Sequence, residues 1–146
     1  MKTIKALTPL FALVALAACE TPAPTQSIAE MDLTDEQTTA ISCTEMLRAT
    51  YDVGEKLGVP GPEPRDEYLG PQDQAMMRIA GDLDEETLMA ARRSAYYAAY
   101  PMLETMLTVE KESGAAAAEA TPEGEGMGKL LDDCTPYYQR SLLAAM

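Results

Sequence analysis

Residues 34–58 read TDEQTTAISCTEMLRATYDVGEKLG and carry the clearest helical pattern in the chain. Thr34 is a favourable N-cap, and Gln37 stands three residues later as its capping-box partner. Small and apolar residues then recur with 4-3-4-3 spacing, at Cys43, Leu47, Thr50, Gly54 and Leu57. Gly58 predicts the end of the helix. We therefore predict one long amphipathic helix whose buried face includes Cys43.

The opposite side of this predicted helix is charged. It presents Glu45, Arg48, Asp52 and Lys56, which we expect to face solvent. Gly54 interrupts the buried face, although glycine costs about 1 kcal/mol relative to alanine in a helix interior. We hypothesise that Gly54 allows a neighbouring segment to approach closely.

The rest of the chain also predicts helices. Further helical patterns cover residues 71–80, 83–100, 102–109 and 137–146. Pro101 is expected to kink or end the helix that precedes it, and Thr135-Pro136 is expected to start the last one. No alternating strand pattern appears. We therefore predict an all-α fold, a small bundle of four to five helices over residues 34–146.

Two segments between these helices lack a regular pattern. Residues 59–70 contain three prolines and two glycines. Residues 113–128, SGAAAAEATPEGEGMG, alternate glycine with acidic and other residues towards their end. Proline and glycine at this density are typical of irregular structure. We predict a loop over residues 59–70 and a mobile acidic loop over residues 113–128.

The composition is strongly acidic and lacks histidine. The 146 residues include 24 Asp and Glu against 11 Lys and Arg, and no His. Such a charge repels nucleic-acid phosphates and favours cationic partners. Without histidine, the commonest general base and metal ligand at neutral pH is missing. We therefore expect no nucleic-acid partner, no metal or other cofactor, and no enzymatic activity.

The first 19 residues have the order of a secretory signal. Lys2 and Lys5 precede a short apolar run, and small residues follow it. The run is too short for a membrane-spanning helix, which needs about 20 apolar residues. The sequence LAAC at residues 16–19 then resembles the lipobox of bacterial lipoproteins, in which a small residue precedes an obligatory cysteine.

The lipobox resemblance implies a location in the cell. The signal, residues 1–18, would be removed, and Cys19 would carry a diacylglycerol and acyl chains such as palmitate, which anchor the chain to a membrane. An Asp after the cysteine often retains such proteins at the inner membrane. Because Glu20 stands here instead, we expect the periplasmic face of the outer membrane, with the inner membrane as the alternative. Residues 19–33 are predicted to be the lipidated cysteine and a short flexible tether.

Two cysteines remain if Cys19 is lipidated. In the oxidising envelope, Cys43 and Cys134 are expected to form a disulfide. It would close a loop of about 90 residues, worth roughly 4–5 kcal/mol in the chain-entropy model. A redox-active or metal-binding pair is the alternative, although the chain has no C-x-x-C motif.

A cluster within residues 92–100 is the candidate binding surface. It consists of Arg92, Arg93, Tyr96, Tyr97 and Tyr100. The arginines could hold a carboxylate or phosphate, and the tyrosines could contact a glycan or a protein partner. The alternative is structural: the arginines pair with nearby acids, and the tyrosines serve as the aromatic residues of the core.

These observations favour a non-catalytic binding or scaffolding module, held at the membrane through its lipid anchor. The expected partner is another envelope protein or a cationic protein. The alternative is a periplasmic module that resembles stress chaperones and loosens when its carboxylates are protonated. A variant of that alternative is an acidic inhibitor of a cationic cell-wall hydrolase. Residues 30–146 resemble no family.

Overall fold

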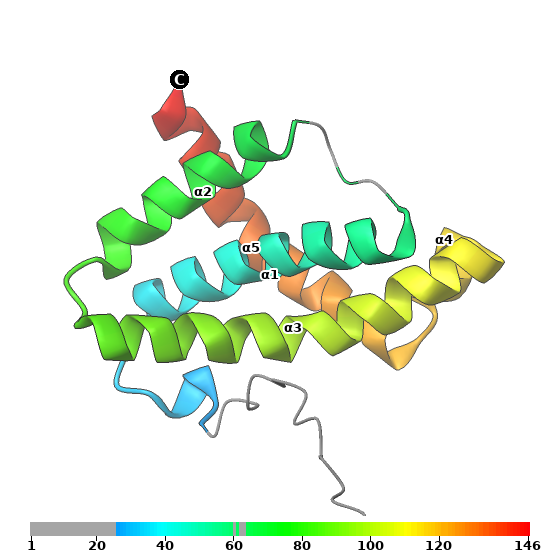
Figure 1. The fold of residues 1–146 in the computed structure, drawn as a ribbon, viewed down its shortest axis with the longest axis horizontal. Coiled ribbons are helices and arrows are strands. Elements are labelled where there is room, and N and C mark those ends of the chain that lie inside the picture. The colour runs from blue at the N-terminus through cyan, green and yellow to red at the C-terminus, as the bar shows by residue number, and fades with distance from the viewer. Residues whose placement is uncertain (1–25, 60, 62–63) are drawn as a thin grey trace, which may run out of the picture.

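The structure, a computed structural model, describes residues 26–146 except 60, 62 and 63, and it is all-α over those residues. The helices pack around one hydrophobic core, and Figure 1 shows how they are arranged. The elements are the 3₁₀ helix η1 (Ile28–Glu30) and the helices α1 (Asp35–Leu57), α2 (Arg65–Ala80), α3 (Glu85–Ser113), α4 (Ala115–Glu119) and α5 (Pro122–Ala145). The predicted all-α bundle of four to five helices is therefore confirmed.

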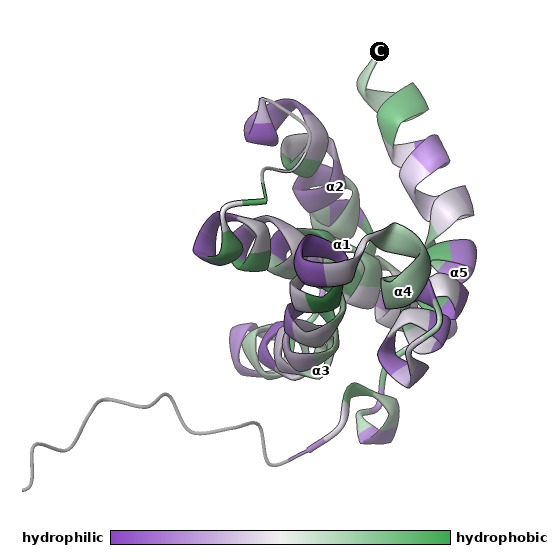
Figure 2. Ribbon diagram, turned by 90° about the vertical axis from the view of Figure 1, so that its right-hand side faces the viewer, coloured by the Kyte–Doolittle hydropathy of each residue, from purple (hydrophilic) through white to green (hydrophobic). Residues whose placement is uncertain are grey.

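Helix α1 is the centre of the bundle. It packs against α3, α2 and α5, and the end-on view in Figure 2 shows α1 between them. Its buried residues consequently lie on several sides of the helix, including Ala40, Ile41, Cys43, Met46, Ala49 and Val53. A single apolar stripe was predicted, but Leu47 on that stripe is only half-buried. Glu45 was expected in solvent and is 3% exposed, so that prediction is wrong.

Both ends of α1 follow the sequence signals. The Thr34 side chain accepts a hydrogen bond from the backbone N–H of Gln37, and the Gln37 side chain accepts one from the backbone N–H of Thr34. The helix ends before Gly58. A Cβ on Gly54 would lie 2.4 Å from the carbonyl oxygen of Val59. Gly54 thus allows a close approach, as hypothesised, and the approaching segment is the turn that follows the same helix.

Prolines interrupt neither α2 nor α3. Helix α2 begins at Arg65, inside the segment predicted as a loop, and continues through Pro71. Helix α3 continues through Pro101, where an end or a kink was predicted. A proline within a helix removes one backbone donor. Buried residues on both sides of Pro101 keep α3 packed against α1, and they are Ala95, Ala99, Leu103 and Leu107.

The predicted loop over residues 113–128 is helical for most of its length. It contains α4 and the start of α5, where Thr121 caps the helix and Pro122 takes the first position. Gly124 is buried, and a Cβ there would lie 2.1 Å from the carbonyl oxygen of Ala118. This glycine therefore allows α4 and α5 to meet closely. The predicted helix start at 135–136 lies inside α5.

A disulfide joins the central helix to the last one. Cys43 of α1 and Cys134 of α5 are bonded, with an S–S distance of 2.06 Å. The two cysteines are 1% and 2% exposed. The predicted pair is therefore confirmed.

The chain just before α1 is attached to the core. Residues 1–25, with the expected signal, Cys19 and the first part of the tether, lie outside the described residues. In the last part of that expected tether, Ser27 caps η1. Ile28, Met31 and Leu33 pack against the core, so this part is ordered against the domain.

Candidate functional site

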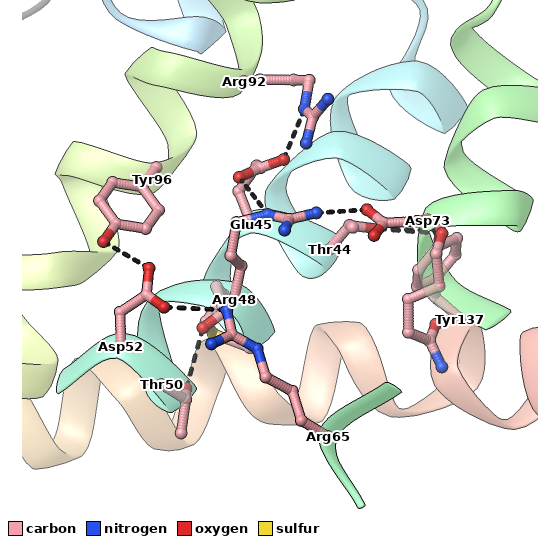
Figure 3. A network of polar contacts seen from close by, with 12 residues as sticks. Thr44, Glu45, Arg48, Thr50, Asp52, Arg65, Asp73, Arg92, Tyr96 and Tyr137 are labelled. Carbon is pink, nitrogen blue, oxygen red and sulfur yellow. Dashed lines mark hydrogen bonds and ion pairs between the residues drawn. The ribbon is translucent and has the colours of Figure 1, made fainter. Parts of the chain in front are cut away.

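A buried carboxylate lies between three helices. Glu45 Oε1 of α1 accepts a hydrogen bond of 2.6 Å from Arg92 Nε of α3. Glu45 Oε2 lies 3.3 Å from Arg48 Nε, and the same arginine reaches Asp73 of α2 at 2.5 Å. Figure 3 shows this chain of contacts running from α3 across α1 to α2. Glu45 and Arg48, on the charged side of α1, therefore connect this helix to α3 and α2.

A second carboxylate continues the network along α1. Asp52 accepts a hydrogen bond of 2.8 Å from the Tyr96 hydroxyl through Oδ2, and one of 2.9 Å from Arg65 through Oδ1. The Arg65 guanidinium also lies 5.5 Å from the centre of the Tyr51 ring. Burial, together with the hydrogen bond to the Asp52 carboxylate, raises the pKa of Tyr96 well above its usual value. Tyr96 therefore stays protonated and donates to Asp52.

The residues of the predicted binding surface differ in how far they are exposed. Arg92 and Tyr96 face inward and are held by carboxylates of α1. Arg93 and Tyr97 are exposed. Tyr100 is half-buried, with the Lys56 ammonium 5.8 Å from its ring centre. The structural interpretation therefore fits Arg92 and Tyr96, whereas the binding interpretation stays a prediction for the exposed residues of the cluster.

The tyrosines of α5 are structural. The Tyr137 hydroxyl donates to the carbonyl oxygen of Gln72 at 3.1 Å and lies 3.1 Å from the Thr44 hydroxyl. The Tyr138 hydroxyl donates to the carbonyl oxygen of Cys43 at 2.7 Å. These contacts connect α5 to α1 and α2 close to the disulfide.

An exposed row of side chains remains on α3. Met89, Arg93 and Tyr97 are spaced four residues apart and therefore share one face. Met89 is 50% exposed and Tyr97 is 37% exposed. Within the described part of the chain, Arg93 forms no ion pair. We name these three residues the α3 row. Beside it lies a shallow pocket of about 210 Å³, lined by Glu45, Met89, Arg92, Arg93 and Tyr96.

A separate pocket lies where α1, α2 and α5 meet. Its volume is about 250 Å³, and its lining includes Glu36, Arg78 and Arg140. Sequence reasoning did not find this pocket, because Arg78 and Arg140 are 62 positions apart and belong to no motif. Only the packing of α2 against α5 brings them together.

Two further features of the described residues bear on chemistry. Among them, no group of three or more Cys, Asp or Glu side chains is arranged to hold a metal ion. Within the same ranges, no helix combines the length and the apolar character needed to cross a membrane.

The chain matches no protein-family model, no curated protein and no solved structure.

Proposed function

We propose that the chain is a lipid-anchored, non-catalytic binding module of the bacterial envelope, which docks another envelope protein on the α3 row. The proposed location in the envelope is supported by the resemblance of residues 16–19 to a lipobox. The Cys43–Cys134 disulfide is consistent with it, because disulfides persist in oxidising compartments.

The observation that carries this proposal is the construction of the α3 row. The inward neighbours Arg92 and Tyr96 are bound by Glu45 and Asp52, so two charged contacts connect α3 to α1 beneath the exposed side chains. Arg93 offers a guanidinium, and Met89 and Tyr97 offer apolar surface on either side of it. Such a surface fits a protein segment with a carboxylate flanked by apolar side chains.

Site-specific crosslinking in native membranes tests the docking surface. A photoreactive amino acid at Tyr97 should capture one defined envelope protein, and the added change Arg93→Glu should abolish the product. The control position is Tyr68 of α2, which is 41% exposed and lies outside the α3 row. Capture at neither position, or of the same proteins at both, would count against the proposal.

The lipid anchor has its own test. Cys19→Ser should prevent incorporation of labelled palmitate and move the protein from the membrane fraction to the soluble periplasmic fraction. Cys43→Ser, which removes a core cysteine, should leave the label in place. A Cys19→Ser variant that remains labelled and membrane-bound would contradict the assignment.

The ion pairs also favour a second candidate, an acid-activated module that suppresses aggregation. The carboxylates of Glu45, Asp52 and Asp73 join α1 to α2 and α3. Carboxylates as a class lose their charge at pH of about 2–3. The ion pairs between these helices would then weaken together. If the protein stays folded and monomeric in that pH range and does not suppress aggregation of an acid-unfolded client, this second candidate fails.

A further inference from the structure

We propose that the pocket between α1, α2 and α5 binds a small organic carboxylate with a short aliphatic body, and that Arg78 and Arg140 hold its charged end. This site is separate from the α3 row and does not depend on the proposed docking function. The pocket is lined by Glu36, Ala75, Arg78, Ile79, Tyr137, Arg140, Ser141 and Ala144.

The charge of the pocket is unusual for this protein. The chain carries a net charge of −13, and four of its basic side chains form ion pairs, namely Arg48, Lys56, Arg65 and Arg92. Arg78 and Arg140 form none within the described ranges, yet they line one cavity. Glu36 is the single carboxylate of that lining. Two guanidiniums against one carboxylate leave a local positive excess, which attracts an anion.

The guanidinium group selects the kind of anion. Its planar arrangement of donors matches a carboxylate or a phosphate with two parallel hydrogen bonds. The two arginines come from different helices, Arg78 from α2 and Arg140 from α5. They can therefore approach one anion from separate directions. This arrangement favours a ligand whose charged end lies in the pocket.

The remaining walls favour an aliphatic carboxylate over phosphate or sugar. Ala75, Ile79 and Ala144 supply apolar surface. The polar groups in the wall already have partners, because Ser141 donates to the carbonyl oxygen of Tyr137 at 2.8 Å and the Tyr137 hydroxyl donates to that of Gln72. Inorganic phosphate has no aliphatic part to cover these apolar side chains, and the hydroxyl groups of a sugar would lie against them without hydrogen-bond partners. An aliphatic acid needs only a charged contact and an apolar wall.

The size and rigidity of the pocket set the scale of the ligand. Its volume of about 250 Å³ lies below the range of about 300–1,000 Å³ that is usual for drug-sized ligands. Tyr137 and the disulfide hold α5 against α1 and α2, so the cavity exists before a ligand arrives. Two sources offer the same chemistry: a free short-chain acid, and the C-terminal carboxylate of a peptide.

Ligand-observed saturation-transfer NMR on the purified full chain tests the site. The probes are butyrate, butyramide, inorganic phosphate, and N-acetyl-Ala-Val with either a free or an amidated C-terminus. We expect saturable binding of butyrate, of the free peptide acid, or of both, and no binding of either amide. Tighter binding of the peptide acid would identify a peptide C-terminus as the ligand, and tighter binding of butyrate a free acid.

Variants assign the binding to the pocket. Arg78→Gln and Arg140→Gln should each weaken carboxylate binding by about tenfold or more, as expected for loss of a charge-assisted hydrogen bond. Glu36→Gln should strengthen it, because a like charge is removed. Lys129→Gln, at an exposed residue of α5 that lies outside both the pocket lining and the α3 row, is the matched control and should leave carboxylate binding unchanged. Thermal unfolding checks that each variant folds, which we expect because Arg78 and Arg140 are exposed.

Three results would overturn the proposal. The first is the absence of saturable binding by any carboxylate probe. The second is equal binding of carboxylates and amides, or of phosphate and butyrate. The third is carboxylate binding that survives in folded Arg78→Gln and Arg140→Gln variants.

Discussion

Glu45 is the residue on which the interior charges converge. Its carboxylate is 3% exposed and contacts both Arg92 and Arg48. Removing one partner of a buried ion pair leaves an uncompensated charge, at a cost of about 3–5 kcal/mol. Because both arginines keep about a quarter of their side chains exposed, we expect Glu45→Gln to lower the free energy of unfolding by about 2–3 kcal/mol.

Urea denaturation measures this change. The control is Glu55→Gln in the same helix, where the carboxylate is exposed and the expected change is within about 0.5 kcal/mol. Equal midpoints for the two variants would show that Glu45 contributes no more than a surface charge.

The burial of Glu45 also shows what periodicity leaves undetermined. The spacing of Cys43, Leu47 and Gly54 correctly indicates a helix, and Cys43 and Gly54 are buried, although Leu47 is only half-buried. It does not reveal how many neighbours the helix has. Because α1 is packed by α2, α3 and α5, residues away from the predicted stripe are also enclosed. A charged residue can occupy such a position once other helices supply partners, and those partners are distant in sequence.

Helix ends were easier to predict than helix continuity. The capping box at Thr34 and the stop at Gly58 are local arrangements, and both were found from the sequence. Pro71 and Gly124 were interpreted as a helix boundary and as irregular structure, and Pro101 as a kink or an end, but all three lie inside helices, so the predicted boundaries and the predicted end are wrong. Tertiary packing offsets the local cost at these positions, and no local pattern reports it. For the candidate site, the sequence identified the arginine–tyrosine cluster but could not separate its inward members from its exposed ones.

The junction of α4 and α5 gives a test of glycine at the level of the helix. A Cβ at Gly124 would meet the backbone of Ala118, whereas a Cβ at Gly128, in the same helix, would meet nothing within 4 Å. We predict that Gly124→Ala destabilises the protein and that Gly128→Ala stabilises it by about 0.5–1 kcal/mol, the usual gain of alanine over glycine in a helix. Thermal or urea unfolding of the pair gives the comparison. Stabilisation by both changes would show that the close approach of the Ala118 backbone does not require glycine at position 124.

At the level of the whole molecule, the disulfide constrains the unfolded chain. Cys43 and Cys134 are 91 residues apart. In the chain-entropy model, a loop of that size is worth roughly 4–5 kcal/mol. We predict that replacing both cysteines with alanine lowers the free energy of unfolding by about that amount. Reduction of the wild-type protein in urea should reproduce the change, and a loss below about 1 kcal/mol would contradict the loop argument.

Alkaline pH should lower the free energy of unfolding, because three tyrosines have raised pKa values in the folded state. Burial raises the pKa values of Tyr96, Tyr137 and Tyr138 in the folded state, whereas unfolded tyrosine titrates near pH of about 10. Above that pH the unfolded chain releases protons that the folded chain still holds, so unfolding becomes more favourable as pH rises. Stability from these residues is fully present below about pH 10.

Urea midpoints measured between pH of about 8 and 11 check this dependence. They should be level at the lower end of the range and fall at the upper end. Tyr138→Phe should flatten the fall, because it removes one of the three hydroxyls whose pKa is raised in the folded state. A midpoint that stays constant over the whole range would contradict the argument.

The bond between Cys43 and Cys134 can form only after both cysteines have been synthesised. Synthesis begins at the N-terminus, so Cys43 appears 91 residues before its partner. At about 5–20 residues per second, that interval lasts roughly 5–20 s. Cys19 is the only cysteine made earlier with which Cys43 could mispair. A lipid on Cys19 would remove that competitor and leave Cys134 as the intramolecular partner of Cys43, so the bond would form only after the chain has been made as far as Cys134.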